Sequence, residues 1–124
     1  MAETYNTGGY DAPITYKDKA VTNTVISVKS TYCNLLGWRI TNPNSTTIYF
    51  KFFDKALANQ VILGTTEPCK EFSVPALGEI FVYEQRAVSH YYFQNGLCIV
   101  AVNGLATSST GTPILNMDVE IYYK

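Results

Sequence analysis

Hydrophobic and polar residues alternate along much of the chain with a period of two, the pattern of a β-strand that buries one face. The clearest case is the segment 117–123, where every second residue is apolar and the acids and Tyr122 lie between. The segment 97–102 is continuously apolar and is bounded by Gly96 and Asn103-Gly104, as expected for a central strand buried on both faces. No comparable stretch shows helical periodicity.

Residues 33–54 predict two further strands joined by a turn, and we expect the rest of the chain to cover this hairpin. Period-two spacing places Leu36, Trp38 and Ile40 on one face, and likewise Ile48, Phe50 and Phe52. The polar side is marked by Arg39, Lys51 and Asp54. Between the runs, Asn42-Pro43-Asn44-Ser45-Thr46 supplies turn residues, because proline fixes φ and Asn and Ser bond their own backbone.

Other short β-rich segments complete an all-β pattern. We expect strands at 21–29, 70–74 and 79–85, the last with both faces partly covered. Residues 55–63 are expected to form a loop, with one helical turn as the alternative, and 106–112 a small-residue loop. Together, the expected segments give about seven or eight strands, spaced along the chain as in a β-sandwich. The fold class is therefore all-β, a single antiparallel sandwich of jelly-roll or immunoglobulin-like type over residues 21–124.

Residues 1–20 contain Gly8, Gly9 and Pro13 without a sustained period, so we expect an extended N-terminal arm. Its three tyrosines are candidate partner-binding residues, because large amphipathic rings anchor segments on neighbouring surfaces: Tyr5, Tyr10 and Tyr16. An arm that orders on assembly is favoured over the alternative of a frayed terminus.

The amino-acid composition limits the classes of partner that we expect the protein to bind. The 124 residues are 47% hydrophobic and only 15% charged, with ten Tyr and six Phe, which favours a protein partner for some of the aromatic surface. A net charge of −1 offers no electrostatic basis for nucleic-acid binding. No apolar run approaches the ~20 residues of a membrane span, and residues 1–6 lack the features of a signal peptide, so we expect synthesis in a cytosol and no membrane partner.

The residues give no catalytic, cofactor or metal motif. Cys33, Cys69 and Cys98 lack CxxC spacing and are expected to be buried thiols, with one Cys–Cys pair still geometrically open. His90 is the only histidine and no GxSxG, GxGxxG or P-loop pattern occurs, so we expect a non-enzymatic protein without cofactors or metals. The strand carboxylates are expected to be solvated: Glu79, Glu84, Asp118 and Glu120.

An aromatic block, Tyr91-Tyr92-Phe93, is a second candidate partner-binding segment. It is too apolar to be left exposed, so packing on the sandwich or on another subunit is favoured. The alternative is a platform that stacks on sugar rings with help from Arg86. Asn44-Ser45-Thr46 matches a glycosylation acceptor, but a turn is the better interpretation.

Several motifs occur in a specific order. They are Trp38 to Pro43, Tyr49-Phe50-Lys51-Phe52-Phe53-Asp54-Lys55-Ala56, Gly64 to Pro68, Phe72 to Gly78, Phe93 to Ala101 and the closing Asp118 to Lys124. In this order they resemble small β-sandwich proteins of tailed-bacteriophage virions, over residues 33–124.

The resemblance implies a virion structural part, such as a capsid decoration or head-auxiliary protein, a fibre-base adaptor, or a collar or tail component. We therefore expect a protein made in the host cytoplasm that docks on a capsid, fibre or collar protein and is capable of homo-oligomer formation. The alternative is a carbohydrate-binding module for host-surface attachment that uses Tyr91, Tyr92 and Arg86. A hydrolase has the least support.

Overall fold

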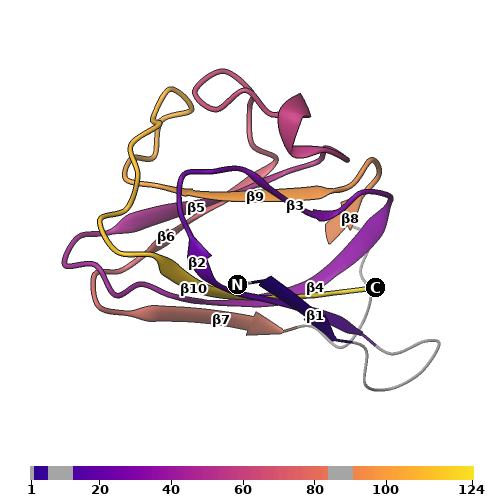
Figure 1. Cartoon of the computed structure of the whole chain (residues 1–124), viewed down its shortest axis with the longest axis horizontal. Coiled ribbons are helices and arrows are strands. Elements are labelled where there is room, and N and C mark those ends of the chain that lie inside the picture. The colour runs from indigo at the N-terminus through magenta and orange to yellow at the C-terminus, as the bar shows by residue number, and fades with distance from the viewer. Residues whose placement is uncertain (1, 6–12, 84–90) are drawn as a thin grey trace.

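Two antiparallel sheets pack face to face in the computed structural model, which describes residues 2–5, 13–83 and 91–124 (Figure 1). Sheet A contains, in spatial order, β1 (Ala2–Tyr5), β2 (Ile14–Val21), β10 (Met117–Tyr123), β4 (Cys33–Thr41) and β7 (Glu79–Tyr83), and β8 (Tyr92–Phe93) pairs with β4. Sheet B contains β3 (Ile26–Lys29), β9 (Leu97–Val102), β5 (Ile48–Phe53) and β6 (Lys70–Val74). One short 3-10 helix, η1 (Ala58–Gln60), lies in the β5–β6 connection.

The strand pairing is nested. The innermost pair along the chain is β5 with β6. Around it, β4 pairs with β7, then β3 with β9, and finally β2 with β10. Contacts of β10 with β4 and of β9 with β5 complete the two sheets. Without the short strands β1 and β8, the remaining eight strands have the order β2-β10-β4-β7 in one sheet and β3-β9-β5-β6 in the other, which is that of a jelly roll. The expected antiparallel β-sandwich is thus confirmed, and the strand order selects the jelly roll over the immunoglobulin-like arrangement.

The core lies between the sheets and is centred on aromatic rings. Trp38 of β4 packs on Phe72 and Phe52 of sheet B, with ring centroids 4.6 and 5.4 Å apart. A second, smaller cluster covers the opposite side of sheet B, so that β9 buries Ile99 in the main core and Val100 in the second cluster. The prediction of a central strand buried on both faces is confirmed at residues 97–102.

The predicted hairpin over residues 33–54 is wrong. β4 belongs to sheet A and β5 to sheet B, so the segment between them crosses from one sheet to the other. The buried Asn42 fixes this crossing, because its amide lies 2.9 Å from the Thr46 carbonyl oxygen and 3.1 Å from that of Val74. Lys51 is also not on a polar side: it is buried, and its Nζ donates to the Ala106 carbonyl at 2.8 Å.

The assignment of faces in β4 needs one correction. The pairing with β10 shifts register between Tyr122 and Tyr123, which face Gly37 and Leu35 respectively. This irregularity interrupts the period of two, so Leu35 rather than Leu36 joins Trp38 in the main core.

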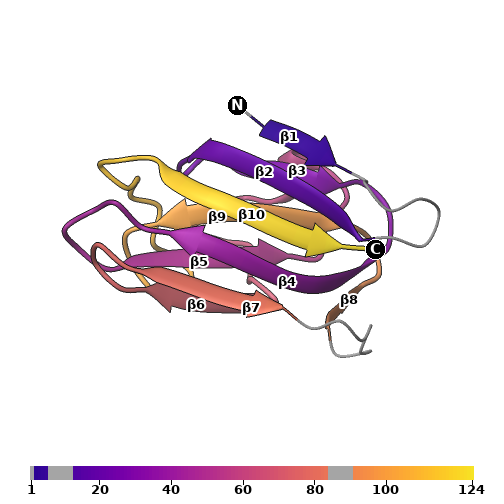
Figure 2. The same ribbon diagram turned by 90° about the horizontal axis from the view of Figure 1, so that it is seen from below.

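The predicted boundary between arm and sandwich is also wrong. Ile14–Val21 forms β2, which pairs with β10 inside sheet A, so most of the second half of the expected arm belongs to the sandwich. The strand expected at 21–29 begins only at Ile26, because Val21 ends β2. Ala2–Tyr5 forms the edge strand β1, with all four residues exposed (Figure 2).

Candidate functional site

The three tyrosines of the expected arm lie in different environments or outside the described residues. Tyr16 is only 5% exposed and lies in the main core, where its hydroxyl donates to Asp18 Oδ2 at 3.1 Å. It is therefore not available to a partner, because β2 carries it into the sandwich. Tyr10 lies outside the described residues. Tyr5 is exposed on β1 and remains a candidate.

The aromatic block 91–93 packs mainly on the sandwich. Phe93 is 2% exposed, and Tyr91 stands edge-on to Trp38 at 5.9 Å with Lys70 Nζ 4.6 Å from its ring centroid. Tyr92 alone is well exposed. Since Tyr91 contacts the core and Tyr92 faces solvent, the two rings do not form a shared platform for a sugar, and Arg86 and His90 lie outside the described residues.

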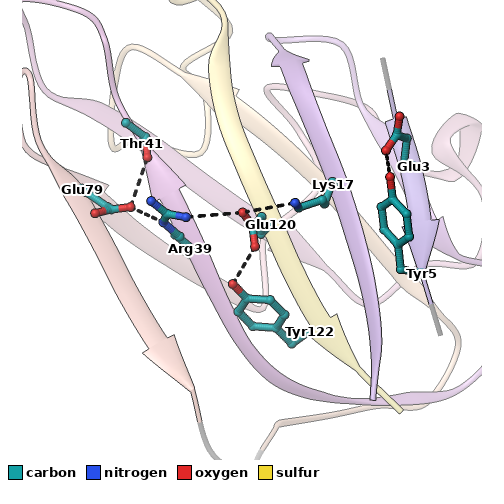
Figure 3. A network of polar contacts seen from close by, with 8 residues as sticks. All are labelled: Glu3, Tyr5, Lys17, Arg39, Thr41, Glu79, Glu120 and Tyr122. Atoms are coloured by element: carbon teal, nitrogen blue, oxygen red, sulfur yellow. Dashed lines mark hydrogen bonds and ion pairs between the residues drawn. The ribbon is translucent and has the colours of Figure 1, made fainter. Parts of the chain in front are cut away.

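The outer face of sheet A carries a group of residues that the sequence did not reveal. Register places five residues from five strands in one line across the sheet: Glu3, Lys17, Glu120, Arg39 and Phe81. We call the first four of them the charged row. The neighbouring line contains Tyr5, Thr15, Tyr122, Gly37 and Tyr83. Figure 3 shows the polar side chains of this face lying side by side.

Opposite charges alternate along the charged row and bind one another. Arg39 Nε donates to Glu79, its Nη1 lies 3.5 Å from Glu120 Oε2, and Lys17 Nζ lies 3.9 Å from the same oxygen (Figure 3). The hydrogen bond that Arg39 donates to Glu79 lowers the pKa of Glu79, and the same bond raises the pKa of Arg39. Lys17 and Arg39 thus compensate Glu79 and Glu120, while the third carboxylate, Glu3, accepts from Tyr5 on β1. Such exposed pairs add little to stability.

Beside the charged row lies an aromatic pocket, which we define by Pro13, Thr15, Phe81, Tyr83 and Tyr122; its volume is about 310 Å³. Tyr122 meets Tyr83 edge-on at 5.5 Å and Phe81 at 6.3 Å. Phe81 and Tyr83 are 61% and 41% exposed, so this face of β7 is open rather than partly covered as expected. The aromatic pocket therefore offers ring surface directly to solvent.

Tyr122 connects the aromatic pocket to the charged row. Its hydroxyl donates to Glu120 Oε1 at 2.9 Å. Burial, followed by the bond to Glu120, raises the pKa of Tyr122 to about 12, so the phenol stays protonated near neutral pH. The oxygen of this fixed donor still has lone pairs with which to accept a hydrogen bond from a ligand.

A second exposed surface lies at the end of the sandwich where the β4–β5, β6–β7 and β9–β10 connections meet (Figure 2). We call it the apolar tip: Leu77, Ile114 and Leu115, which are 75%, 88% and 51% exposed. The buried Asn44 joins these loops, since its carbonyl accepts from Leu77 N at 2.9 Å and its side chain bonds Leu115 N and O at 2.7 and 2.9 Å. Large aliphatic side chains are thus presented on a fixed base.

One residue of these loops has a strained backbone, and another explains the motif Asn44-Ser45-Thr46. Leu77 has a φ of 53°, a left-handed conformation that costs a non-glycine residue about 1–3 kcal/mol, and residues strained in this way cluster at functional sites. Asn44 is 3% exposed with both amide atoms bonded, so the Asn44-Ser45-Thr46 match is a structural turn, as interpreted from the sequence.

The remaining chemistry of the described residues is modest. Cys33 and Cys98 are buried free thiols, whereas Cys69 is exposed, contrary to expectation, because it lies just outside strand β6. Within the described ranges, no group of three or more His, Cys, Asp or Glu side chains could hold a metal ion, and no helix is long and apolar enough to cross a membrane. Comparison with protein-family models, with curated proteins and with solved structures found no match.

Proposed function

We propose that this protein is a non-enzymatic structural component of a bacteriophage virion that docks on another virion protein, of the capsid, fibre or collar, through the apolar tip. The observation that carries the proposal is the exposure of Leu77, Ile114 and Leu115 on loops tied together by Asn44. The order of sequence motifs over residues 33–124 supports the virion context.

The chemistry of the apolar tip favours a protein as the partner. Aliphatic side chains neither stack on sugars or bases nor form hydrogen bonds, and they contribute affinity by filling an apolar recess of another protein. Because Asn44 already orders the loops, little conformational entropy is lost on docking. Many copies on one particle need only modest affinity each.

A structural role also accounts for the carboxylates of sheet A. Glu79 and Glu120 both accept from Arg39, and Glu120 also accepts from Tyr122, so both are engaged by neighbouring side chains. The bond from Arg39 lowers the pKa of Glu79, whereas a group poised for acid–base catalysis has a pKa tuned towards the working pH. This arrangement favours surface cohesion over proton transfer.

Incorporation into particles tests the proposal. Particles produced from the genome that carries this gene are purified, and the protein is quantified in them by mass spectrometry. We expect a fixed copy number, and we expect the double variant Ile114→Ser, Leu115→Ser to be depleted about tenfold or more. The matched control is Ile62→Ser, which removes an aliphatic side chain of 64% exposure from the β5–β6 connection rather than from the apolar tip.

A further variant separates docking from folding. Leu77→Gly removes the side chain and relieves the left-handed strain, so it should leave the unfolding free energy unchanged or raised while it weakens incorporation. Absence of the wild-type protein from particles, or normal incorporation of the apolar-tip variants, would refute the proposal. Removing residues 2–5 tests a contribution of β1 alone, since a deletion of residues 1–20 would also remove most of β2.

A further inference from the structure

The aromatic pocket on sheet A has the size of a small-ligand site. Its volume of about 310 Å³ lies at the lower end of the range of such sites, about 300–1,000 Å³. The exposed rings of Phe81 and Tyr83 line one side of it, and Thr15 of β2 lies on the other side of Tyr122. A flat ligand of one or two rings fits these dimensions.

Aromatic rings select the apolar face of such a ligand. The ring face carries partial negative charge, so it attracts polarised C–H bonds, which a pyranose presents on one of its faces. Tyr122 stands edge-on to both Phe81 and Tyr83, at interplanar angles of 77° and 90°. The rings are therefore held at fixed angles by mutual contact before any ligand arrives, which lowers the entropic cost of binding.

The charged row supplies the hydrogen-bonding edge. Sugar hydroxyls both donate and accept, and Arg39 and Lys17 provide donors while Glu120 provides acceptor oxygens next to the pocket. A guanidinium has five N–H groups, of which Arg39 uses two in the bonds to Glu79 and Glu120. Donors and acceptors thus remain for a ligand that lies against Tyr122.

The balance of charge defines the class of ligand. Lys17 and Arg39 are compensated by Glu79 and Glu120, and the third carboxylate, Glu3, lies on the edge strand β1 beyond Lys17. The rim next to the rings therefore has no excess of one sign to attract an anion or a cation. A second copy of this chain is a poor occupant, because a flat protein interface would remove these paired charges from water with no new partner. We infer that the aromatic pocket of sheet A binds a ring of a neutral saccharide. This site is independent of the apolar tip.

The inference is tested by titrating the isotope-labelled full chain with four neutral methyl glycosides, those of glucose, galactose, mannose and N-acetylglucosamine, at millimolar concentrations. N-acetylneuraminic acid serves as the charged comparison. We expect at least one neutral glycoside to bind in the millimolar range and to shift the backbone amide signals of Thr15, Phe81, Tyr83 and Tyr122. Phe81→Ala should weaken binding about tenfold.

Controls separate the pocket from general surface effects. Tyr92→Ala removes an exposed ring outside the pocket, so it should bind within about twofold of the wild type. The Ile114→Ser, Leu115→Ser variant should bind sugar normally, which distinguishes this site from the proposed docking surface. Circular dichroism of Phe81→Ala checks that the fold is retained.

Four outcomes would overturn the inference. They are the absence of pocket shifts with all four neutral glycosides, shifts confined to other residues, stronger binding of N-acetylneuraminic acid than of any neutral sugar, and unchanged binding by folded Phe81→Ala. A change of oligomeric state in Phe81→Ala without sugar binding would identify a second copy as the occupant instead.

Discussion

Asn42 is the residue whose replacement tests the description of the fold most directly. It is fully buried at the end of β4, and its Nδ2 lies within 2.9–3.1 Å of the carbonyl oxygens of Thr46, Val74 and Pro75. Its Oδ1 accepts from both the backbone and side-chain nitrogens of Asn44, each at 2.9 Å. One amide therefore joins the crossing from β4 to β5 with the end of β6.

The Asn42→Ala variant should lose about 4 kcal/mol of unfolding free energy. The variant loses two donated and two accepted hydrogen bonds, each worth about 1 kcal/mol net. The buried groups that were bonded to Asn42 are then left with neither a partner nor water, which adds to the loss. Asn42→Asp should be worse near neutral pH, because it places a buried negative charge against three carbonyl oxygens. Burial against these oxygens raises the pKa of the carboxyl group in the folded state, and protonation turns it into a donor. The stability of this variant should therefore rise as the pH falls from 7 towards about 4, the pKa of the unfolded chain, and level off below it.

Equilibrium urea unfolding followed by the fluorescence of the buried Trp38 measures these effects. Asn59→Ala, at an exposed position of η1, is the matched control and should stay within about 0.5 kcal/mol of the wild type. A loss below about 1 kcal/mol for Asn42→Ala, or an Asn42→Asp variant that is no less stable than Asn42→Ala at pH 7, would refute this account of the crossing.

Two further predictions concern packing and pH. A Cβ on Gly37 would overlap the Val82 carbonyl oxygen and lie 2.8 Å from Tyr83 Cα, so Gly37→Ala should cost about 1–3 kcal/mol in urea unfolding and displace β7; a change below about 0.5 kcal/mol would contradict it. Burial raises the pKa of Cys33 from 9.0 to about 11, so the folded state keeps a proton that the unfolded state loses. Stability should therefore fall by about 2–3 kcal/mol from pH 9 to 11, and a Cys33→Ala variant with the same alkaline slope would refute this.

The strands that could be predicted from the sequence are those with an unbroken local pattern. The alternation of β10 and the apolar run of β9 were recognised because every position fits one rule. β2 was missed because its pattern is interrupted at Asp18, a buried acid that accepts hydrogen bonds from Tyr16 and from Ala20 N. A charged residue at a core position hides a strand unless its bonding partners are known.

The candidate surfaces depend on register and on loop meeting points, which local patterns do not contain. Tyr83 and Tyr122 become neighbours only because β4 lies between their strands and carries Gly37 at the row where the two rings meet. The apolar tip likewise joins Leu77 and Leu115 through a side chain of a third loop. The three consecutive aromatic residues 91–93 can be recognised in the sequence, but the packing of Tyr91 on Trp38 cannot be predicted from it.

The position of β10 has a consequence for synthesis on the ribosome. This strand follows every other described strand in the chain, yet it lies inside sheet A between β2 and β4. Until residue 123 has left the exit tunnel, β2 and β4 lack the neighbour that joins them, and the edges of both strands stay open to pairing with other nascent chains. Translation that stops before β10 therefore yields an aggregation-prone polypeptide rather than a smaller folded protein.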